Sequence, residues 1–213
     1  KKENIRCNSA ADLEAIKAGL GVDCLESEEA LEKLAGFCNT EPRLPDAGKK
    51  EFVLGGESLG ISLGMTREEI LERLESIRGR NDTADLTFYA FRDLRLTEPW
   101  PFLAAAIKRN PVSIEGASGM EIGEVTKVIG EVPDVSIYEG PGRLAQPDEV
   151  WNFGRGDGLE KAVLLASIMH SRMPGEDISI EIDPDRALLH AGKEKYEFVS
   201  RKGVGQQRWQ LSP

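Results

Sequence analysis

The sequence predicts an α+β protein, in which helices dominate the N-terminal half and a central helix packs on a small antiparallel sheet in the C-terminal half. Apolar residues recur at helical spacing behind several residues that favour helix N-termini. Short segments near the C-terminus alternate apolar and polar residues around a glycine turn. With 213 residues, of which 40% are hydrophobic and 30% charged, the chain has enough apolar surface for a packed core.

Residues 1–45 are predicted to form a helical N-terminal segment. Ser9 can cap a helix that runs to about Leu20, and Ser27 can cap a second helix. The polar residues 39–50, with two prolines and a glycine, predict a boundary. The second helix carries one apolar stripe, formed by Ala30, Leu31, Leu34 and Phe37.

A small α+β module is predicted over residues 51–110. Thr66 and Glu69 form a capping box at the start of a helix, and the alternating residues 86–96 predict a strand. A short helix over 102–109 ends before an Asn-Pro pair. The apolar face of the first helix consists of Ile70, Leu71, Leu74 and Ile77.

The start of this module has the sequence Leu-Gly-Met-Thr-Arg-Glu-Glu at residues 63–69. It resembles the helix start of a small module found in bacterial envelope lipoproteins of the outer-membrane assembly type, over residues 53–97. The resemblance implies a scaffold in the cell envelope, and an ordinary helix–hairpin unit is the alternative. The chain begins at Lys1 without an initiator Met, so either a targeting segment was removed or the sequence is trimmed. Of the possible locations we favour an extracytoplasmic one (periplasmic or secreted).

A helix is predicted near the start of the C-terminal core, residues 111–213. Ser118 and Glu121 match a capping box, and Gly130 is expected to end the helix. Its expected buried face consists of Ile122, Val125, Val128 and Ile129.

The central helix of this core is predicted to begin at Asp157. A glycine-rich approach leads to Asp157, which is a good N-cap residue, and Glu160 follows three residues later. Residues 157–171 are apolar over most of the helix circumference, which is typical of a buried helix. Antiparallel strands are predicted over 178–200, where isoleucines alternate with polar residues and Gly192 occupies a turn.

The approach to the central helix carries a longer pattern. The residues that form it are Pro147, Glu149, Gly154, Gly156, Asp157, Lys161, Ala162, Leu164, Leu165 and Ala166. In order and spacing they resemble the active-site helix of the transglutaminase-like superfamily, which are papain-like Cys-His-Asp proteins. The resemblance implies a truncated transglutaminase-like core over residues 111–213.

The sequence departs from that family at the position of the nucleophilic cysteine, where it has Gly158. A thiol at a helix N-terminus is activated as a thiolate, whereas glycine supplies no nucleophile. The resemblance therefore implies a non-catalytic member with a degenerate cleft and no catalytic or metal-binding residue. The residues expected at this cleft are Trp151, Asp157, Gly158 and His190.

Two registers fit the family's histidine and acid. In the first, Gly192 aligns with the family's hairpin turn, the histidine position falls near Asp183–Arg186, and Ser200 replaces the acid. In the second, His190 is the family's histidine and Gly192 replaces the aromatic residue that follows it. We favour the first register, and the nucleophile is lost in both.

The composition excludes several classes of function. Acidic residues outnumber basic ones by 37 to 27, which argues against nucleic acid as a partner. No apolar run approaches the roughly 18–20 residues of a membrane span. The two histidines and three cysteines lack the spacing of a zinc site, and no cofactor is expected.

Three functions stay open. The first is a non-catalytic module that binds a protein or peptide partner or has a structural role. The second is a cysteine-type peptidase or amide hydrolase with relocated catalytic groups, which would need Cys24 or Cys38 beside His190. The third is the envelope scaffold.

Overall fold

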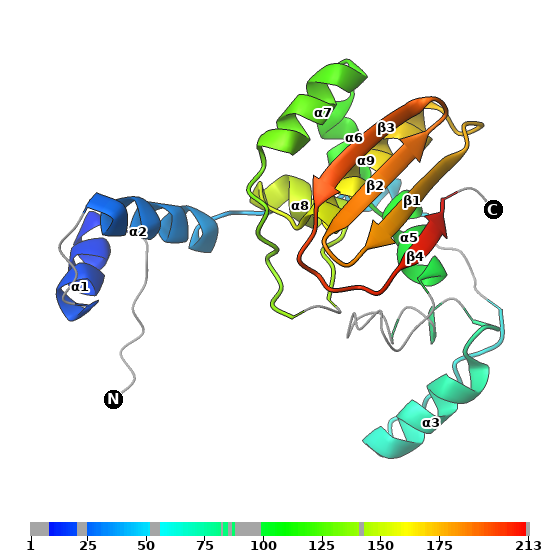
Figure 1. Ribbon diagram of the computed structural model, residues 1–213. Helices are drawn as coiled ribbons and strands as arrows, with labels where there is room; N and C mark the ends of the chain where they lie inside the picture. The colour runs from blue at the N-terminus through cyan, green and yellow to red at the C-terminus, as the bar shows by residue number, and fades with distance from the viewer. Residues whose placement is uncertain are drawn as a thin grey trace. The chain divides into compact units, whose positions relative to one another are not determined.

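The chain divides into two compact units, residues 1–43 and residues 44–213. The first unit is helical in its described part, and the second contains the sheet and the main hydrophobic core. The computed structural model describes residues 9–20, 25–51, 56–81, 83–84, 87, 99–140 and 143–211 (Figure 1).

As far as it is described, the first unit contains two helices, α1 (Ala10–Leu20) and α2 (Leu25–Cys38), followed by the non-helical residues 39–43. The cap of α1 is confirmed: the Ser9 backbone N–H donates to Asp12 Oδ2 at 3.0 Å, and the Asp12 N–H donates to Ser9 Oγ at 3.2 Å. The prediction that Ser27 caps α2 is wrong, because the helix already begins at Leu25. Leucine and glutamate are good helix formers, so they extend the helix ahead of the serine.

A short 3-10 helix, η1 (Ala47–Lys49), and α3 (Arg67–Ile77) precede the main core of the second unit. The capping box of α3 is confirmed, since the Thr66 N–H donates to Glu69 Oε2 at 2.7 Å and the Glu69 N–H donates to Thr66 Oγ1 at 3.2 Å. The strand predicted over 86–96 lies outside the described residues, apart from Thr87, which is helical. A small separate hydrophobic cluster is formed by Leu59, Ile70, Leu74, Ile77 and Ala84.

A four-stranded antiparallel sheet forms one layer of the second unit. Its strands are β1 (Ile178–Asp183), β2 (Arg186–Ala191), β3 (Glu194–Val199) and β4 (Gln207–Gln210). The strand order is β3-β2-β1-β4, with every neighbouring pair antiparallel. The strands predicted over 178–200 are confirmed, and Gly192 occupies the predicted turn with a φ of 57°. The fourth strand was not predicted.

The central element of the second unit is α9 (Gly158–Arg172), with Asp157 as its N-cap. Every residue from Gly158 to Met169 is buried, because the sheet covers one side of the helix and shorter helices cover the others (Figure 1). The helix predicted over 157–171 is therefore confirmed, and so is the α+β class. The surrounding helices are α5 (Trp100–Lys108), α6 (Pro111–Ala117), α7 (Ile122–Glu131) and α8 (Pro147–Phe153).

One hydrophobic core joins these helices to the sheet. Leu165 is fully buried in it, and the rings of Phe102 from α5 and Trp209 from β4 lie 6.5 Å apart. α5 also belongs to this core, to which it contributes Phe102, Leu103 and Ala106. The sheet contributes alternate residues, among them Ile178, Ile180, Ile182, Ala187, Leu189, Ala191 and Phe198.

The start of α7 differs from the prediction. Its N-cap is Glu121 and not Ser118, and Glu124 completes the capping box, because the Glu121 N–H donates to Glu124 Oε2 at 2.9 Å. Ser118 instead follows the end of α6, where its hydroxyl donates to the Glu115 carbonyl at 2.8 Å. The serine is therefore used at the end of one helix and not at the start of the next.

The buried face of α7 is narrower than predicted. Val125 and Ile129 are buried, whereas Val128 is 40% exposed. Val125 and Ile129 are four residues apart and therefore share one face of the helix, whereas Val128 lies beside this face. Gly130 lies inside the helix, which ends at Glu131.

Replacing Leu165 with alanine is expected to lower the free energy of unfolding by about 2–5 kcal/mol, because the truncation leaves a cavity in a packed core. Leu63→Ala is the matched control, since Leu63 is fully exposed and its loss should change stability by no more than about 0.5 kcal/mol. Urea unfolding followed by circular dichroism measures both. A Leu165→Ala protein as stable as its parent would contradict the central position of α9.

Candidate functional site

The start of α9 is held by its N-cap residue, Asp157, which is 3% exposed. Its Oδ1 atom accepts a hydrogen bond from the Leu159 backbone N–H at 3.0 Å, which satisfies one of the N–H groups that a helix leaves free in its first turn. The same carboxylate accepts bonds from two residues that follow β3. Ser200 Oγ donates to Oδ1 at 2.6 Å, and the Arg201 N–H donates to Oδ2 at 2.7 Å. Asp157 therefore ties the helix start to the end of β3.

A second carboxylate, that of Glu160, is completely buried in the first turn of α9. Its Oε2 atom accepts from the Asp157 N–H at 2.9 Å, and its Oε1 atom accepts from Ser136 Oγ at 2.7 Å and from the Ala145 N–H at 2.8 Å. Lys202 Nζ lies 3.4 Å from the same Oε1 atom. The negative charge is thus both hydrogen-bonded and paired, as a buried carboxylate requires.

Two buried lysines fasten the segment between α7 and α8 to the same place. Lys202 Nζ donates to three carbonyl oxygens of this segment, of which that of Arg143 is the nearest at 2.5 Å. Lys161, with a side chain 2% exposed, donates to Asp134 Oδ1 at 2.6 Å and to the Val132 carbonyl oxygen. The term helix-start network is used below for Asp157, Glu160, Lys161, Ser200 and Lys202.

Gly158, which directly follows the N-cap, packs against the backbone of β3. A Cβ atom at Gly158 would lie 2.0 Å from the Val199 carbonyl oxygen and 3.0 Å from the Phe198 carbonyl carbon. Strand backbone cannot move aside as the end of a flexible side chain can, so any side chain at this position would force the helix start and β3 apart. A nucleophilic side chain has no room there.

His190 lies on the face of the sheet opposite to α9. Its neighbours in β2, Leu189 and Ala191, point into the core, so the alternation of the strand directs His190 outwards. There its Nε2 atom lies 3.2 Å from Glu181 Oε2 of the adjacent β1. The sheet itself therefore separates the imidazole from the start of α9.

Trp151 lies on α8 and is half-buried. Its indole packs on Gly116 of α6, where a Cβ atom would lie 2.6 Å from Trp151 Nε1. The absence of a side chain at Gly116 makes room for the ring, so Trp151 contributes to the packing between the two helices.

The first register involves the turn at Asp183–Arg186 and Ser200, and these two parts of the chain meet at the start of α9. Ser200 donates its hydroxyl to Asp157, and its N–H donates at 2.8 Å to the carbonyl of Asp185 in the turn between β1 and β2. The turn and the end of β3 are thereby joined beside the helix N-terminus.

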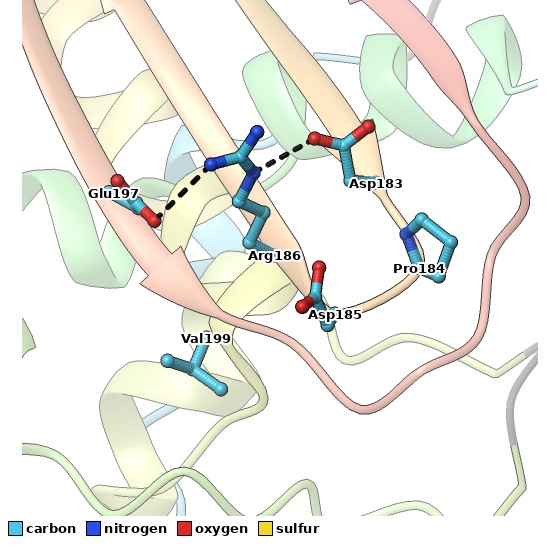
Figure 2. A pocket seen from close by; sticks show the side chains of 6 residues that line it. All are labelled: Asp183, Pro184, Asp185, Arg186, Glu197 and Val199. Atoms are coloured by element: carbon cyan, nitrogen blue, oxygen red, sulfur yellow. Dashed lines mark hydrogen bonds and ion pairs between the residues drawn. The ribbon is translucent and has the colours of Figure 1, made fainter.

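An open pocket of about 510 Å³ lies at this turn, on the outer face of the sheet (Figure 2). Arg186 spans it: its Nε atom lies 2.8 Å from Asp183 Oδ2, and its Nη1 atom lies 3.8 Å from Glu197 Oε1. The hydrogen bond to Asp183, together with the charges of Asp183 and Glu197, raises the pKa of Arg186. The lining residues are Asp183, Pro184, Asp185, Arg186, Glu197 and Val199.

The pocket lacks the groups needed for acyl transfer. None of its lining residues is Ser, Thr, Cys or His, so none supplies a nucleophile of the hydroxyl or thiol type or an imidazole base. The Val199 side chain lines the pocket, whereas the Val199 carbonyl faces Gly158, so the β3 backbone separates the pocket from the helix start. Our sequence reasoning missed this pocket. Its signal was the Asp-Pro-Asp-Arg turn at 183–186, but only the fold shows that β3 lies beside it.

The described ranges offer few other chemical groups. Within them, no group of three or more His, Cys, Asp or Glu side chains could hold a metal ion. Cys38 is a free and exposed thiol of the first unit, and Cys7 and Cys24 lie outside the described residues. No helix in the described part of the chain is long and apolar enough to cross a membrane.

Comparison of the chain with protein-family models, curated proteins and solved structures finds no match. Its class is therefore defined by the fold and the site alone. They describe an α+β protein whose central helix begins in a buried network of charged groups. An open acidic pocket lies on the outer face of the sheet, and the β3 backbone separates it from this network.

Lys202→Met is expected to lower the free energy of unfolding by about 3–5 kcal/mol, because it leaves the buried Glu160 carboxylate without its cationic partner. Lys127→Met is the control, since Lys127 and its partner Glu131 are 77% and 68% exposed and lie 4.0 Å apart. The control should cost no more than about 0.5 kcal/mol. Equal losses in chemical denaturation would show that the network is not buried in solution.

Gly158→Ala is expected to destabilise the protein by about 1–3 kcal/mol or more, because the added methyl group overlaps the β3 backbone. Gly123→Ala is the matched control, since Gly123 lies in the first turn of α7 and a Cβ atom there meets nothing within 4 Å. Alanine favours the helix over glycine, so the control should gain up to about 1 kcal/mol. Thermal unfolding distinguishes the two, and a stabilised Gly158→Ala protein would refute the close contact.

Proposed function

We propose that this chain is a non-catalytic member of the transglutaminase-like superfamily that acts as a binding or structural interaction module. The family-like residues lead into α9, which is the buried central helix. Antiparallel strands follow this helix in the chain, and the helix start packs on the end of β3. Both features are those that the resemblance implies.

The observation that carries the proposal is the contact between Gly158 and β3. The family's chemistry needs a thiol at this position, facing a substrate and an imidazole. Here the 2.0 Å distance from a Cβ position to the Val199 carbonyl oxygen leaves space for neither a thiol nor a substrate. His190, which is the family's histidine in the second register, lies on the other face of the sheet.

The helix-start network supports a structural use of the family pattern. Asp157 and Lys161 belong to the pattern, and both are buried and bonded to segments that pack around α9. Buried charges of this kind are strongly destabilising when one partner is removed. Folding alone therefore accounts for these two residues, without a catalytic role.

The alternative of relocated catalytic groups has less support. His190 and Glu181 form a histidine–acid pair, but a nucleophile must also contact the imidazole. Ser179, which lies opposite His190 in the register of β1 and β2, accepts a hydrogen bond from Arg208 Nη2 at 3.3 Å. Its hydroxyl is thus positioned by an arginine.

The envelope-scaffold alternative rests on the helix start at 63–69. The capping box there is confirmed, but it is a local signal that indicates the start of a helix and no particular function.

The wild-type protein is expected to show no alkylation-sensitive turnover of amine-incorporation or peptide-hydrolysis substrates. The assay is run with and without iodoacetamide, and Cys38→Ser is the control for the exposed thiol. Turnover that iodoacetamide abolishes would overturn the proposal. Loss of that turnover in Cys38→Ser would then identify the thiol responsible.

Gly158→Cys is expected to create no activity and to lose stability as Gly158→Ala does. The thiol overlaps the β3 backbone, and general acid–base help of about 10²–10⁴-fold is missing without an imidazole nearby. The same two assays and a thermal melt measure this. A folded Gly158→Cys protein with robust turnover would contradict the separation of His190 from the helix start.

A further inference from the structure

β3 is an edge strand with an unpaired outer edge. The strand order β3-β2-β1-β4 gives it a single neighbour, β2 (Figure 1). In the part of the chain that is described, no segment other than β2 forms backbone hydrogen bonds with β3. Such an edge presents N–H and C=O groups with which another strand can pair.

The pairing of β3 with β2 decides which residues face the open edge. The Ser200 N–H donates to the Asp185 carbonyl at 2.8 Å, and this bond continues the ladder by one residue pair. In an antiparallel ladder, residues that bond to the neighbouring strand alternate with residues whose backbone groups point away from it. Even-numbered residues of β3 therefore bond to β2, and Lys195 and Glu197 direct their backbone groups to the open edge.

The side chains of Lys195 and Glu197 lie on the outer face of the sheet. Phe198 is buried on the inner face, and the alternation of the strand places these two residues on the opposite side. Both are exposed, Glu197 by 61% of its side chain. A cation and an anion two residues apart on one face make the edge complementary to an antiparallel copy of itself.

We propose that the chain pairs with a second copy of itself through β3, antiparallel, with Lys195 of each copy opposite Glu197 of the other. The two-fold axis then passes between the two Tyr196 residues, perpendicular to the sheet, and keeps α9 of both copies on the same side of the joined sheet. Each Lys195–Glu197 pair exchanges two backbone hydrogen bonds, because both residues face the open edge. Opposite charges directly across the ladder strengthen the pairing.

Within β3 itself, charge favours this register over the neighbouring ones. A shift by two residues in one direction places Lys195 opposite Lys195, and there Glu197 lies opposite Lys193, which belongs to the turn before the strand. A shift in the other direction places Glu197 opposite Glu197 and leaves Lys195 opposite the uncharged Val199. Like charges directly opposite each other destabilise a strand pair. A shift by one residue would place outer-face residues opposite inner-face residues.

The other edge of the sheet lacks this complementarity. In β4, the Leu211 N–H donates to the Ile178 carbonyl at 2.9 Å, so Arg208 and Gln210 face the open edge. A self-paired β4 would place a cation opposite a neutral amide. The dimer is therefore assigned to β3, where it pairs Lys195 with Glu197. The Val199 carbonyl faces the same edge but packs on Gly158, so the proposed pairing is limited to the stretch before Val199 and uses no residue of α9.

Sedimentation equilibrium of the full chain, from low micromolar to several hundred micromolar protein, tests the proposal. We expect a reversible dimer. Lys195→Glu and Glu197→Lys should each raise the dissociation constant about tenfold, because each creates two like-charge oppositions across the ladder. The double variant Lys195→Glu/Glu197→Lys restores opposite charges and should return the dissociation constant close to that of the wild type.

Lys193→Glu is the matched control, because it makes the same charge change in the turn before β3 and lies opposite the uncharged Val199 in this register. Its dissociation constant should equal that of the wild type. Thermal melts verify that each variant is folded, which matters for Glu197→Lys because Glu197 also lies 3.8 Å from Arg186. Lys195→Glu provides the test should Glu197→Lys unfold.

Three results would overturn the proposal. The first is a wild-type protein that stays monomeric over the whole concentration range. The second is a dimer that Lys195→Glu weakens no more than Lys193→Glu does. The third is a folded double variant that dimerises no more tightly than the single variants, because this would exclude the Lys195–Glu197 register.

Discussion

The structure of the second unit depends on how the start of α9 is buried. A helix leaves four backbone N–H groups without partners in its first turn, and here that turn lies inside the protein. Asp157 and Glu160 accept bonds from this backbone and from the segments around it, while Lys161 and Lys202 pair with acids and bind carbonyl oxygens. Buried charges are tolerated only when they are fully partnered. The network therefore sets the positions of the end of β3 and of the segment between α7 and α8.

Gly158 decides how closely the helix and the sheet approach. Without a side chain there, the helix start contacts the Val199 carbonyl directly, and the carboxylate of Asp157 reaches the residues that follow β3. A side chain at this position would hold the two elements apart and open a space between them. The same glycine thus explains both the tight network and the lack of room for a side chain between the helix start and β3. The described pocket lies instead on the outer face of the sheet.

Most of the core elements could be predicted because short-range interactions specify them. The capping box of Asp157 and Glu160, and the alternation of isoleucines before the Gly192 turn, are readable from a few neighbouring residues. Local reasoning failed at Ser27 and Ser118, where residues other than the expected serine begin the helix. It also missed β4, because a strand of four residues gains its stability from pairing with the distant β1 and has little pattern of its own.

The candidate site shows the same division between local and long-range information. The amino-acid sequence by itself determined that a buried helix begins at Asp157 and that the residue after this N-cap has no side chain. Only the tertiary structure decided what that glycine contacts, since Val199 is distant in the chain and reaches Gly158 through the folding of the sheet. It also decided that His190 faces outwards, because a strand directs its residues to two faces and the packing of α9 selects which face is buried.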